Sequence, residues 1–356
     1  MIELPKSYLN ECGWLKSEEP ANDLVISCRI RLARNIEGIP FSQWASSSDL
    51  KRISDMTLQS LRKSNHLNDA DVFAMEELDS MDRNFLAERY MISREFAKSG
   101  IERYVTISPN HTISVMVNEE DHLRMQVLYT GHNLREAWGQ IDNIDRELES
   151  DLEFSFSNTF GYLTACPTNV GTGIRCSVMV HLPALVMSRK IEKVLNAVTQ
   201  IGLTVRGLAG EGSEITGNLF QISNQWTLGI SEEETISKIE KILQQILQQE
   251  RNEETAMIEK SRTELEDRVW RAYATLKYAR VLSSNEAVEL LSTLRLGRSL
   301  GILEQPRFEN LNEMLIMMRP AHLQKRASRT LKTQERDEYR AEFIRSWMDT
   351  ETGESR

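Results

Sequence analysis

Three carboxylates stand side by side in the run VNEEDHLR, and an arginine follows them. Glu119, Glu120 and Asp121 precede Arg124 in this run. Adjacent carboxylates repel one another, so they are stable only where water or cations surround them. The simpler interpretation is a solvated turn. The alternative is a carboxylate pair that orients a cationic nucleophile, with one glutamate acting as general base.

Arginines lie beside predicted strand ends and loops elsewhere in the chain. Arg29 and Arg31 are two residues apart, so on a strand they share one face. Arg124, Arg175 and Arg206 each stand next to a predicted strand end or a glycine-containing loop. Arginine suits phosphate because its planar guanidinium donates two parallel hydrogen bonds and stays charged. Each arginine alone is typical of a protein surface, but the five together indicate phosphate binding.

Cys166 begins the run CPTNVGTGIR, which ends at Arg175. A lone cysteine is usually a small buried residue, whereas a cysteine among arginines is typical of a reactive thiol. Glycines here and in RGLAGEG at 206–212 would let backbone amides approach phosphate oxygens. Neither run matches GxxxxGK[ST] or GxGxxG, so the glycines alone decide nothing. The combination predicts phosphoryl transfer to a positive nucleophile, and a guanidinium meets that requirement.

Composition narrows the class of protein. The 356 residues include 53 acidic and 43 basic ones, and the net charge of −10 argues against a nucleic-acid-binding protein. No apolar run approaches the roughly 18 residues that a membrane span needs, and the first residues do not form a signal-peptide pattern. The four cysteines show neither zinc-site nor disulfide spacing. We therefore expect a cytoplasmic protein.

The elements that must position these residues follow from hydrophobic periodicity. Alternating apolar residues on both sides of Pro109 predict a β-hairpin over 101–120. Apolar residues at spacings of three and four predict a helix from Leu134 to Leu152. The other predicted elements are a strand at 175–183, a helix at 188–200, two strands within 203–225, and a helix that begins at Ser231 with a capping box to Glu234.

Beyond about residue 254 the sequence changes in character. It is rich in arginine and glutamate and is predicted to be helical, with Pro306 and Pro320 as the main breaks. Strands and helices before this point, and helices after it, predict an α+β fold with an antiparallel sheet flanked by helices and an all-α C-terminal domain. The predicted divisions are a short N-terminal segment (1–22), a catalytic domain (23–253) and a helical domain (254–356).

Taken in order, the motifs resemble those of the phosphagen (guanidino) kinases, and most of all the bacterial protein-arginine kinases. They are SCRIRLARN, VNEEDHLR, CPTNVGTGIR and RGLAGEGSE followed by ISN, and the resemblance covers residues 23–253. The resemblance implies a phosphagen-kinase-like catalytic domain that transfers the γ-phosphoryl group of ATP to arginine residues of proteins. It also implies ATP and Mg²⁺ as cofactors, with no direct protein ligand to the metal.

The resemblance also implies roles for single residues. Glu120 matches the carboxylate that binds the guanidinium and assists its deprotonation, and Glu119 and Asp121 support it and the waters of the metal. Cys166 matches the thiol beside the substrate guanidinium. The residues implied in ATP binding are Ser27, Cys28, Arg29, Ile30, Arg31, Arg124, Arg175, Cys176, Ser177, Val178, Met179, Arg206, Gly207, Leu208, Ala209, Gly210 and Glu211.

The run RDEYRA at 336–341 resembles the phosphoarginine-binding motif of the same kinases. Arg336 and Arg340 are four residues apart, so on a helix they share a face on which both could bind a phosphoryl group. Asp337 would pair with the guanidino nitrogens of that ligand, and Ala341 completes the motif. The alternative is a solvated helix face of mixed charge.

Two features depart from the small-molecule kinases of the family. Only 28 residues precede Arg29, where those kinases have a helical domain that helps to enclose the substrate. We therefore expect an open site, which suits an arginine on a protein surface. Tyr90, in ERYMIS, stands where relatives have a histidine of the nucleotide site, so we expect the nucleotide contact there to differ.

The resemblance further implies a role in stress response and a set of partners. These are a heat-shock transcription repressor that the kinase inactivates, a zinc-binding activator protein, the Clp unfoldase–protease that degrades the marked proteins, and a second copy of the chain in a homodimer. Two alternatives stay open. One is a non-catalytic phosphoarginine-binding adaptor that keeps a kinase-like body, and the other is a kinase for free arginine.

Overall fold

The computed structural model describes residues 4–5, 7–10, 12–15, 23–98, 100–207 and 216–352. The α-helices are α1 (Ser7–Asn10), α2 (Ser47–Leu61), α3 (Ser80–Glu88), α4 (Leu134–Glu149), α5 (Pro183–Met187), α6 (Ile191–Gln200), α7 (Glu232–Tyr278), α8 (Ser284–Ser299), α9 (Phe308–Met317), α10 (Pro320–Arg326) and α11 (Thr333–Thr352). Short 3₁₀ helices are η1 (Gly13–Leu15), η2 (Phe96–Lys98) and η3 (Pro167–Asn169). The strands are β1 (Val25–Arg34), β2 (Asp71–Ala74), β3 (Tyr104–Ile107), β4 (Ile113–Val117), β5 (Leu123–Thr130), β6 (Phe156–Ser157), β7 (Gly161–Tyr162), β8 (Ile174–His181), β9 (Leu203–Arg206) and β10 (Leu219–Asn224).

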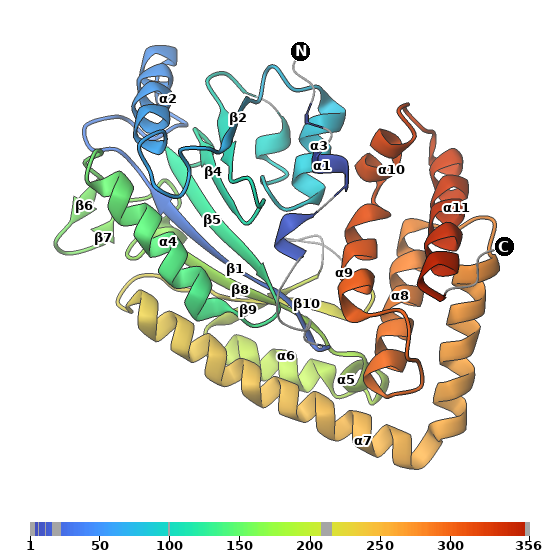
Figure 1. Cartoon of the computed structure of the whole chain (residues 1–356). Helices are drawn as coiled ribbons and strands as arrows, with labels where there is room; N and C mark the ends of the chain where they lie inside the picture. The colour runs from blue at the N-terminus through green and yellow to red at the C-terminus, as the bar shows by residue number, and fades with distance from the viewer. Residues whose placement is uncertain are drawn as a thin grey trace. The chain divides into compact units, whose positions relative to one another are not determined.

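An eight-stranded sheet has the strand order β2-β3-β4-β5-β1-β8-β10-β9 (Figure 1). Strand β1 pairs with β5, β5 with β4, β4 with β3 and β3 with β2, each pair antiparallel. Strands β6 and β7 form a separate antiparallel pair. An antiparallel sheet flanked by helices confirms the predicted fold class, and the hairpin predicted over 101–120 is β3–β4.

The chain divides into two compact units. The first unit comprises Met1–Trp14, Ser27–Ser177 and Ser223–Glu240, and the second comprises Leu15–Ile26, Val178–Ile222 and Lys241–Arg356. Within the first unit, α4 packs against β5, and α2 contacts both α4 and β4 (Figure 1). The predicted apolar stripe of α4 is buried, since Ile141, Ile144 and Leu148 are 0% exposed.

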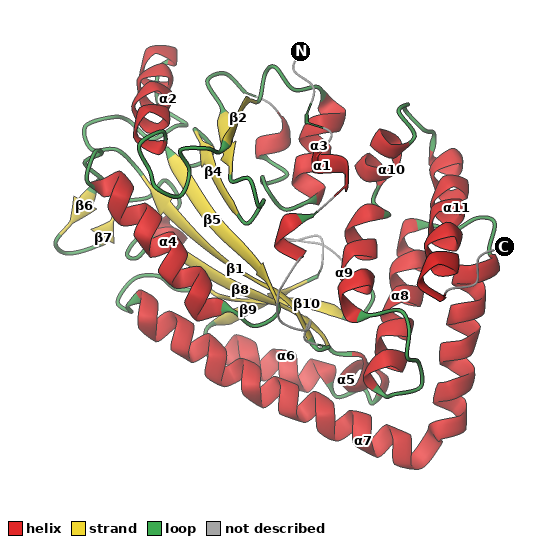
Figure 2. Cartoon of the chain, viewed as in Figure 1, coloured by secondary structure: helices red, strands yellow, loops and turns green. Residues whose placement is uncertain are grey.

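Within the second unit, α8 contacts α9, α9 contacts α10, and α10 contacts α11. Their apolar faces meet in a core that includes Leu294, Leu311, Ile344 and Met348. Figure 2 shows helices joined by loops throughout the described residues beyond 232, as the sequence predicts for this part of the chain. None of the helices in the described ranges combines the length and apolar character of a membrane span.

Helix α7 continues past residue 254, where the sequence predicts a domain boundary. It is interrupted instead at Ser261, whose φ of −144° and ψ of 37° are not helical, and Figure 1 shows α7 changing direction. No proline or glycine marks this break, so sequence patterns did not indicate it. Pro183 also differs from expectation, because it not only follows β8 but opens α5 at the first helical position. The division at 253/254 stays a prediction.

Candidate active site

Three arginines share one face of the sheet because of strand register. Arg29 and Arg31 alternate along β1 with Cys28 and Ile30, which are 1% and 0% exposed on the opposite face. The antiparallel register of β1 with β5 pairs residue 33 with Arg124. Directly opposed residues in antiparallel strands point to the same face. Register therefore places Arg29, Arg31 and Arg124 together.

Arg175, on the neighbouring strand β8, adds a fourth charge to this arginine cluster. Burial, together with the charges of Arg124 and Arg175, lowers the pKa of Arg29 to about 10. Burial and the other three guanidinium groups lower the pKa of Arg31 well below its usual range, and Nε of Arg31 is buried without a hydrogen-bond partner. Cations held against their mutual repulsion are stabilised by a bound anion. The arginine cluster is therefore suited to a polyphosphate.

Glu119 connects the arginine cluster to the acidic turn that follows β4. Its carboxylate accepts hydrogen bonds from Arg124 and from the hydroxyl of Ser93. Burial opposes the charge of Glu119, but Arg124, Ser93 and Arg31 outweigh it and hold the pKa of Glu119 below its ordinary value. Glu119 is therefore an ionised partner of Arg124.

The surroundings of Glu120 shift its pKa in the opposite direction to that of Glu119. Burial raises the pKa of Glu120, and the charges of Asp121 and Glu119 raise it further. Its carboxylate is in hydrogen-bonding contact with the thiol of Cys166, whose Sγ is 3.0 Å from Oγ1 of Thr168. A raised pKa makes a carboxylate a better proton acceptor. The structure thus brings together two predicted catalytic residues, Glu120 and Cys166.

The loop that carries Cys166, residues 166–173, is held by buried polar contacts. Arg34, at the end of β1, binds both carboxylate oxygens of Asp145 on α4, at 3.0 and 2.6 Å. The same guanidinium donates to the main-chain oxygen of Thr172 at 2.9 Å. From the other side, the hydroxyl of Thr227 donates to two carbonyl oxygens of the loop, at 2.9 and 2.7 Å. These contacts fix the loop against the sheet and α4.

Two glycines let this loop approach neighbouring backbone closely. Gly171 and Gly173 have φ values of +115° and +68°. A Cβ on Gly173 would lie 2.7 Å from the oxygen of Ala33, and one on Gly171 would lie 2.3 Å from the oxygen of Thr227. The backbone packing of the protein itself therefore requires glycine here, and the phosphate contact that the sequence suggests stays a prediction.

Tyr90 lies beside the arginine cluster. The guanidinium carbon of Arg29 is 5.9 Å from the centre of the Tyr90 ring, and the ring of Trp14 meets Tyr90 edge-on at 6.1 Å. Its backbone is in the left-handed region, with φ of +63°, and its carbonyl accepts a hydrogen bond from Gln126 at 2.5 Å. Tyr90 thus contacts a phosphate-binding candidate rather than standing apart from the site.

The other residues predicted to bind ATP lie on β1, β8, β9 and the segment after β9. Ser27 and Ser177 are buried, and the hydroxyl of Ser177 donates to the main-chain oxygen of Arg29 at 3.3 Å. Cys176 and Val178 are 0% exposed, Met179 belongs to the core of the second unit, and Arg206 ends β9 with Gly207 after it. Four predicted residues lie outside the described ranges, namely Leu208, Ala209, Gly210 and Glu211.

The RDEYRA residues lie on α11. Arg340 is 1% exposed and donates to two main-chain oxygens at 2.7 and 3.1 Å and to the carboxylate of Asp337 at 2.5 Å. Ala341 is 0% exposed, whereas Arg336 and Asp337 are partly exposed. Arg340 is thus committed to the protein itself, and a phosphoarginine pocket here stays a prediction.

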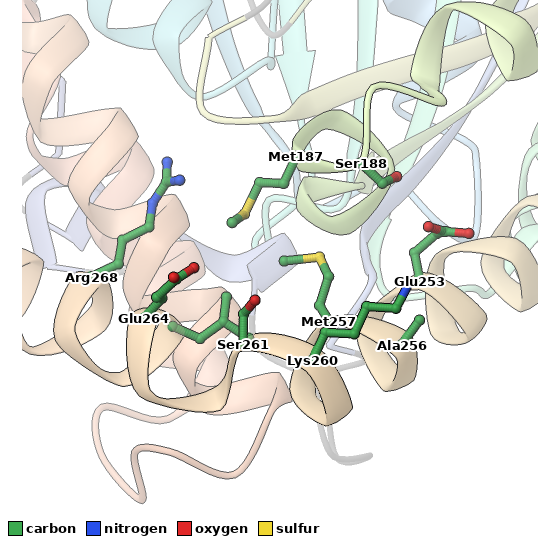
Figure 3. Close-up of a pocket in the computed structure, with 10 residues that line it drawn as sticks. Met187, Ser188, Glu253, Ala256, Met257, Lys260, Ser261, Glu264 and Arg268 are labelled. Carbon is green, nitrogen blue, oxygen red and sulfur yellow. The ribbon is translucent and has the colours of Figure 1, made fainter.

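A cavity of about 460 Å³ lies at the break in α7. Met187 and Met257 point into it from α5 and α7, and Arg268 extends toward it from beyond the break (Figure 3). None of the residues that line it belongs to the predicted site, so we do not place catalysis there.

Sequence patterns gave no role to Asn35, Ser93 or Asp145, although each contacts the site. Asn35 closes the run SCRIRLARN, and its place in that motif was the one available signal. Ser93 is separated from its partner Glu119 by 26 positions, and Asp145 from Arg34 by 111. Local periodicity carries no information about such distant pairs.

Comparison with known proteins gives a consistent result. The family model "ATP:guanido phosphotransferase, C-terminal catalytic domain" matches residues 52–253, and the model "Protein-arginine kinase McsB C-terminal domain" matches residues 262–356. A protein-arginine kinase of Halothermothrix orenii is 43% identical over 340 residues, covering 96% of this chain and 97% of the relative. One of Brevibacillus brevis is 44% identical over 338 residues, covering 94% of each.

Solved structures show the same fold at lower identity. Lombricine kinase matches with a TM-score of 0.59 and 23% identity, covering 67% of this chain and 69% of its own. The duplicated taurocyamine kinase of Schistosoma mansoni matches with a TM-score of 0.61 and 23% identity. That match covers 68% of this chain but 36% of the duplicated kinase.

Proposed function

The chain belongs to the ATP:guanido phosphotransferase family and, within it, to the protein-arginine kinases, and on that premise we propose that it phosphorylates arginine side chains of proteins. The γ-phosphoryl group of ATP is transferred to the guanidinium. One observation carries the proposal: the arginine cluster is linked through Glu119 to the pair formed by Glu120 and Cys166. A polyanion site thus adjoins a site for a cation.

The proposed transfer reaction follows from the positive charge of the arginine cluster and the negative charge of Glu120. Arg29, Arg31, Arg124 and Arg175 neutralise the phosphates and the charge that develops during transfer. Glu120 binds the arginine guanidinium and accepts its proton. The guanidino nitrogen forms a bond to the γ-phosphorus, and the bond to the β,γ-bridging oxygen breaks, so its electron pair leaves with ADP. The Cys166 thiol orients the guanidinium beside Glu120.

Magnesium enters this proposal bound to ATP. Within the part of the chain that the structure describes, no three His, Cys, Asp or Glu side chains lie together as metal ligands. The oxygens of Glu119 are committed to Arg124 and Ser93, and Oδ1 of Asp121 accepts two hydrogen bonds. These carboxylates fit a metal that is held by phosphate oxygens and reached through water. Bound there, Mg²⁺ supplies charge neutralisation at the phosphates.

The proposal extends to domains and partners. The catalytic domain is 23–253 after a short segment at 1–22, and the helical domain 254–356 carries a phosphoarginine pocket in its RDEYRA run. The ATP site is completed by the predicted residues of β8, β9 and the segment 207–211. By resemblance, this cytoplasmic kinase is a homodimer of the stress response. Its partners are a heat-shock transcription repressor, a zinc-binding activator and the Clp unfoldase–protease that degrades marked proteins.

The test is mass spectrometry of an arginine-rich protein such as casein after incubation with this chain, ATP and magnesium. Samples stay at neutral or mildly basic pH because the phosphoramidate bond is acid-labile. We expect phosphate on arginine residues, and none with Glu120→Ala, whose side chain is at the surface and whose loss leaves the fold intact.

Other outcomes would redirect the proposal. Consumption of ATP with free arginine, but no phosphate on protein, would indicate a small-molecule kinase. No transfer to either acceptor, together with tight binding of a phosphoarginine peptide, would indicate an adaptor. Retained transfer in Glu120→Ala would reject Glu120 as the base.

A further inference from the structure

Two loops must meet for the acceptor half of the site to exist. Glu120 lies in the turn between β4 and β5, and Cys166 opens η3 after β7. Loops are mobile unless buried contacts hold them. The contact between the Glu120 carboxylate and the Cys166 thiol therefore needs a fixed element that binds both loops.

Asn35 is that element. It follows β1 directly and is 1% exposed. Its Nδ2 donates to Oδ1 of Asp121 at 2.7 Å and to the main-chain oxygen of Leu163 at 3.0 Å. Its Oδ1 accepts from the backbone N–H of His122 at 2.9 Å. One buried amide thus makes two hydrogen bonds to the turn of Glu120 and one to the segment between β7 and Cys166.

A further hydrogen bond joins the residues next to Glu120 and Cys166 directly. Oδ1 of Asp121 also accepts from the backbone N–H of Ala165, at 2.7 Å. Asp121 follows Glu120 directly, and Ala165 precedes Cys166 directly. The bond from Asp121 to Ala165 therefore fixes the spacing of the two reactive side chains, and Asn35 orients the carboxylate that makes it.

The donors and the acceptor of the Asn35 amide are all in use. An asparagine offers two N–H donors and one oxygen acceptor, and here both kinds of group have buried partners. An aspartate would keep the acceptor for His122 but would turn lone pairs toward Asp121 and Leu163. An alanine would leave buried acceptors without donors. The position thus specifies an amide.

We propose that Asn35 is a positioning residue of the acceptor half of the site, which holds Glu120 and Cys166 in contact. Its side chain bonds to protein groups around the pair and acts on the reaction through them. The kinetic part of the inference rests on the proposed kinase function. The structural part, the coupling of Glu120 to Cys166, can be measured without turnover.

The measurement is the rate of alkylation of Cys166 by iodoacetamide at pH 8, followed by peptide mass spectrometry. The thiolate is the form that reacts. Glu120→Gln replaces the carboxylate that contacts the Cys166 thiol, so it should change the alkylation rate about tenfold in an otherwise unchanged chain. In Asn35→Ala the same Glu120→Gln change should alter the rate less than about twofold. Cys28 and Cys176 are buried and report unfolding if they react.

A matched control separates positioning from loss of stability. Asn312 is also 1% exposed, and its Oδ1 accepts from Arg295 at 2.6 Å within the second unit. Asn312→Ala should leave the tenfold coupling intact. If Asn35→Ala does not fold, Asn35→Asp takes its place, because it keeps the acceptor for the backbone N–H of His122 and removes both donors to Asp121 and Leu163. We expect Asn35→Asp to lose the coupling as well, and an unchanged coupling in it would overturn the inference.

Kinetics then separate this inference from the proposed function. In Asn35→Ala we expect kcat for an arginine peptide to fall more than tenfold while KM for ATP stays within about twofold, because the hydrogen bonds of the Asn35 side chain go to Asp121, Leu163 and His122 and not to the arginine cluster. Unchanged coupling of Glu120 to Cys166 in Asn35→Ala would overturn the inference even if activity fell. Lost coupling in a chain without kinase activity would support it and reject the proposed function alone.

Discussion

The buried ion pair between Arg34 and Asp145 gives the sharpest prediction about stability. Arg34 is 1% exposed, and its guanidinium binds Asp145 through Nε at 3.0 Å and Nη2 at 2.6 Å. It also lies 3.5 Å from the centre of the Tyr162 ring. Asp145→Asn would keep the shape of the side chain and remove its charge. The guanidinium would then be buried without a counter-ion.

The size of the effect follows from this burial. Removing one partner of a buried ion pair costs about 3–5 kcal/mol, because the remaining charge stays desolvated. Each 1.4 kcal/mol is a factor of ten, so the unfolding equilibrium constant should rise by about two to three and a half orders of magnitude. Replacing both residues, as in Arg34→Met with Asp145→Leu, should cost less, about 1–3 kcal/mol, because no buried charge is left and only the main-chain oxygens of Ala33 and Thr172 lose the guanidinium as a donor.

The assay is urea denaturation followed by circular dichroism and by fluorescence, with coincident transitions required before a free energy is derived. The control is Asp267→Asn, which breaks an ion pair with Arg271 whose side chains are 62% and 78% exposed. That change should cost less than about 0.5 kcal/mol. A loss below about 1 kcal/mol in Asp145→Asn, or a double variant less stable than Asp145→Asn, would refute the argument.

Three further predictions concern protonation and the loop. Burial and neighbouring carboxylates raise the pKa of Glu120. Therefore kcat/KM should fall on acidification through a pKa above the ordinary 4.5. A plot of kcat/KM against pH that is still flat at pH 4.5 would contradict this. Burial raises the pKa of Glu250 to about 7, so its contribution to folding is complete below about pH 4.5 and is lost as the pH rises through 7. Glu250→Gln should therefore flatten the decline in unfolding free energy between pH 5 and 8, by up to about 3 kcal/mol, and an unchanged slope would exclude this role. Gly173→Ala would push a Cβ against the oxygen of Ala33. It should lower the free energy of unfolding by about 1–3 kcal/mol and should also lower activity. The control Gly139→Ala lies in open space on α4 and should lower neither the free energy of unfolding nor the activity.

Elements with a local pattern were predictable from the sequence. The apolar spacing from Leu134 to Leu148 gave α4, and the alternation around Pro109 gave the β3–β4 hairpin. The capping box was correct as well, because Ser231 and Glu234 exchange backbone and side-chain hydrogen bonds at 2.9 and 3.2 Å. In each case the residues that determine the element lie within a few positions of one another.

Features that depend on distant contacts were not predictable in this way. The break at Ser261 has no proline or glycine, and the 47–98 segment, with α2, β2 and α3, was not assigned at all. The division into two units interleaves separate stretches of chain, which no composition change marks. Buried polar residues such as Asn35 resemble ordinary surface residues in a sequence, since only their partners distinguish them.

Glu119 and Glu120 show most directly what the sequence leaves open. They are the same residue type in adjacent positions, yet the pKa of Glu119 is lowered and that of Glu120 is raised. Successive side chains leave the turn in different directions, so Glu119 reaches Arg124 and Ser93 while Glu120 reaches Cys166. The surroundings therefore make one carboxylate a permanent counter-ion and the other a proton acceptor. Glutamine at 119 should accordingly disturb phosphate binding, whereas glutamine at 120 should disturb proton transfer.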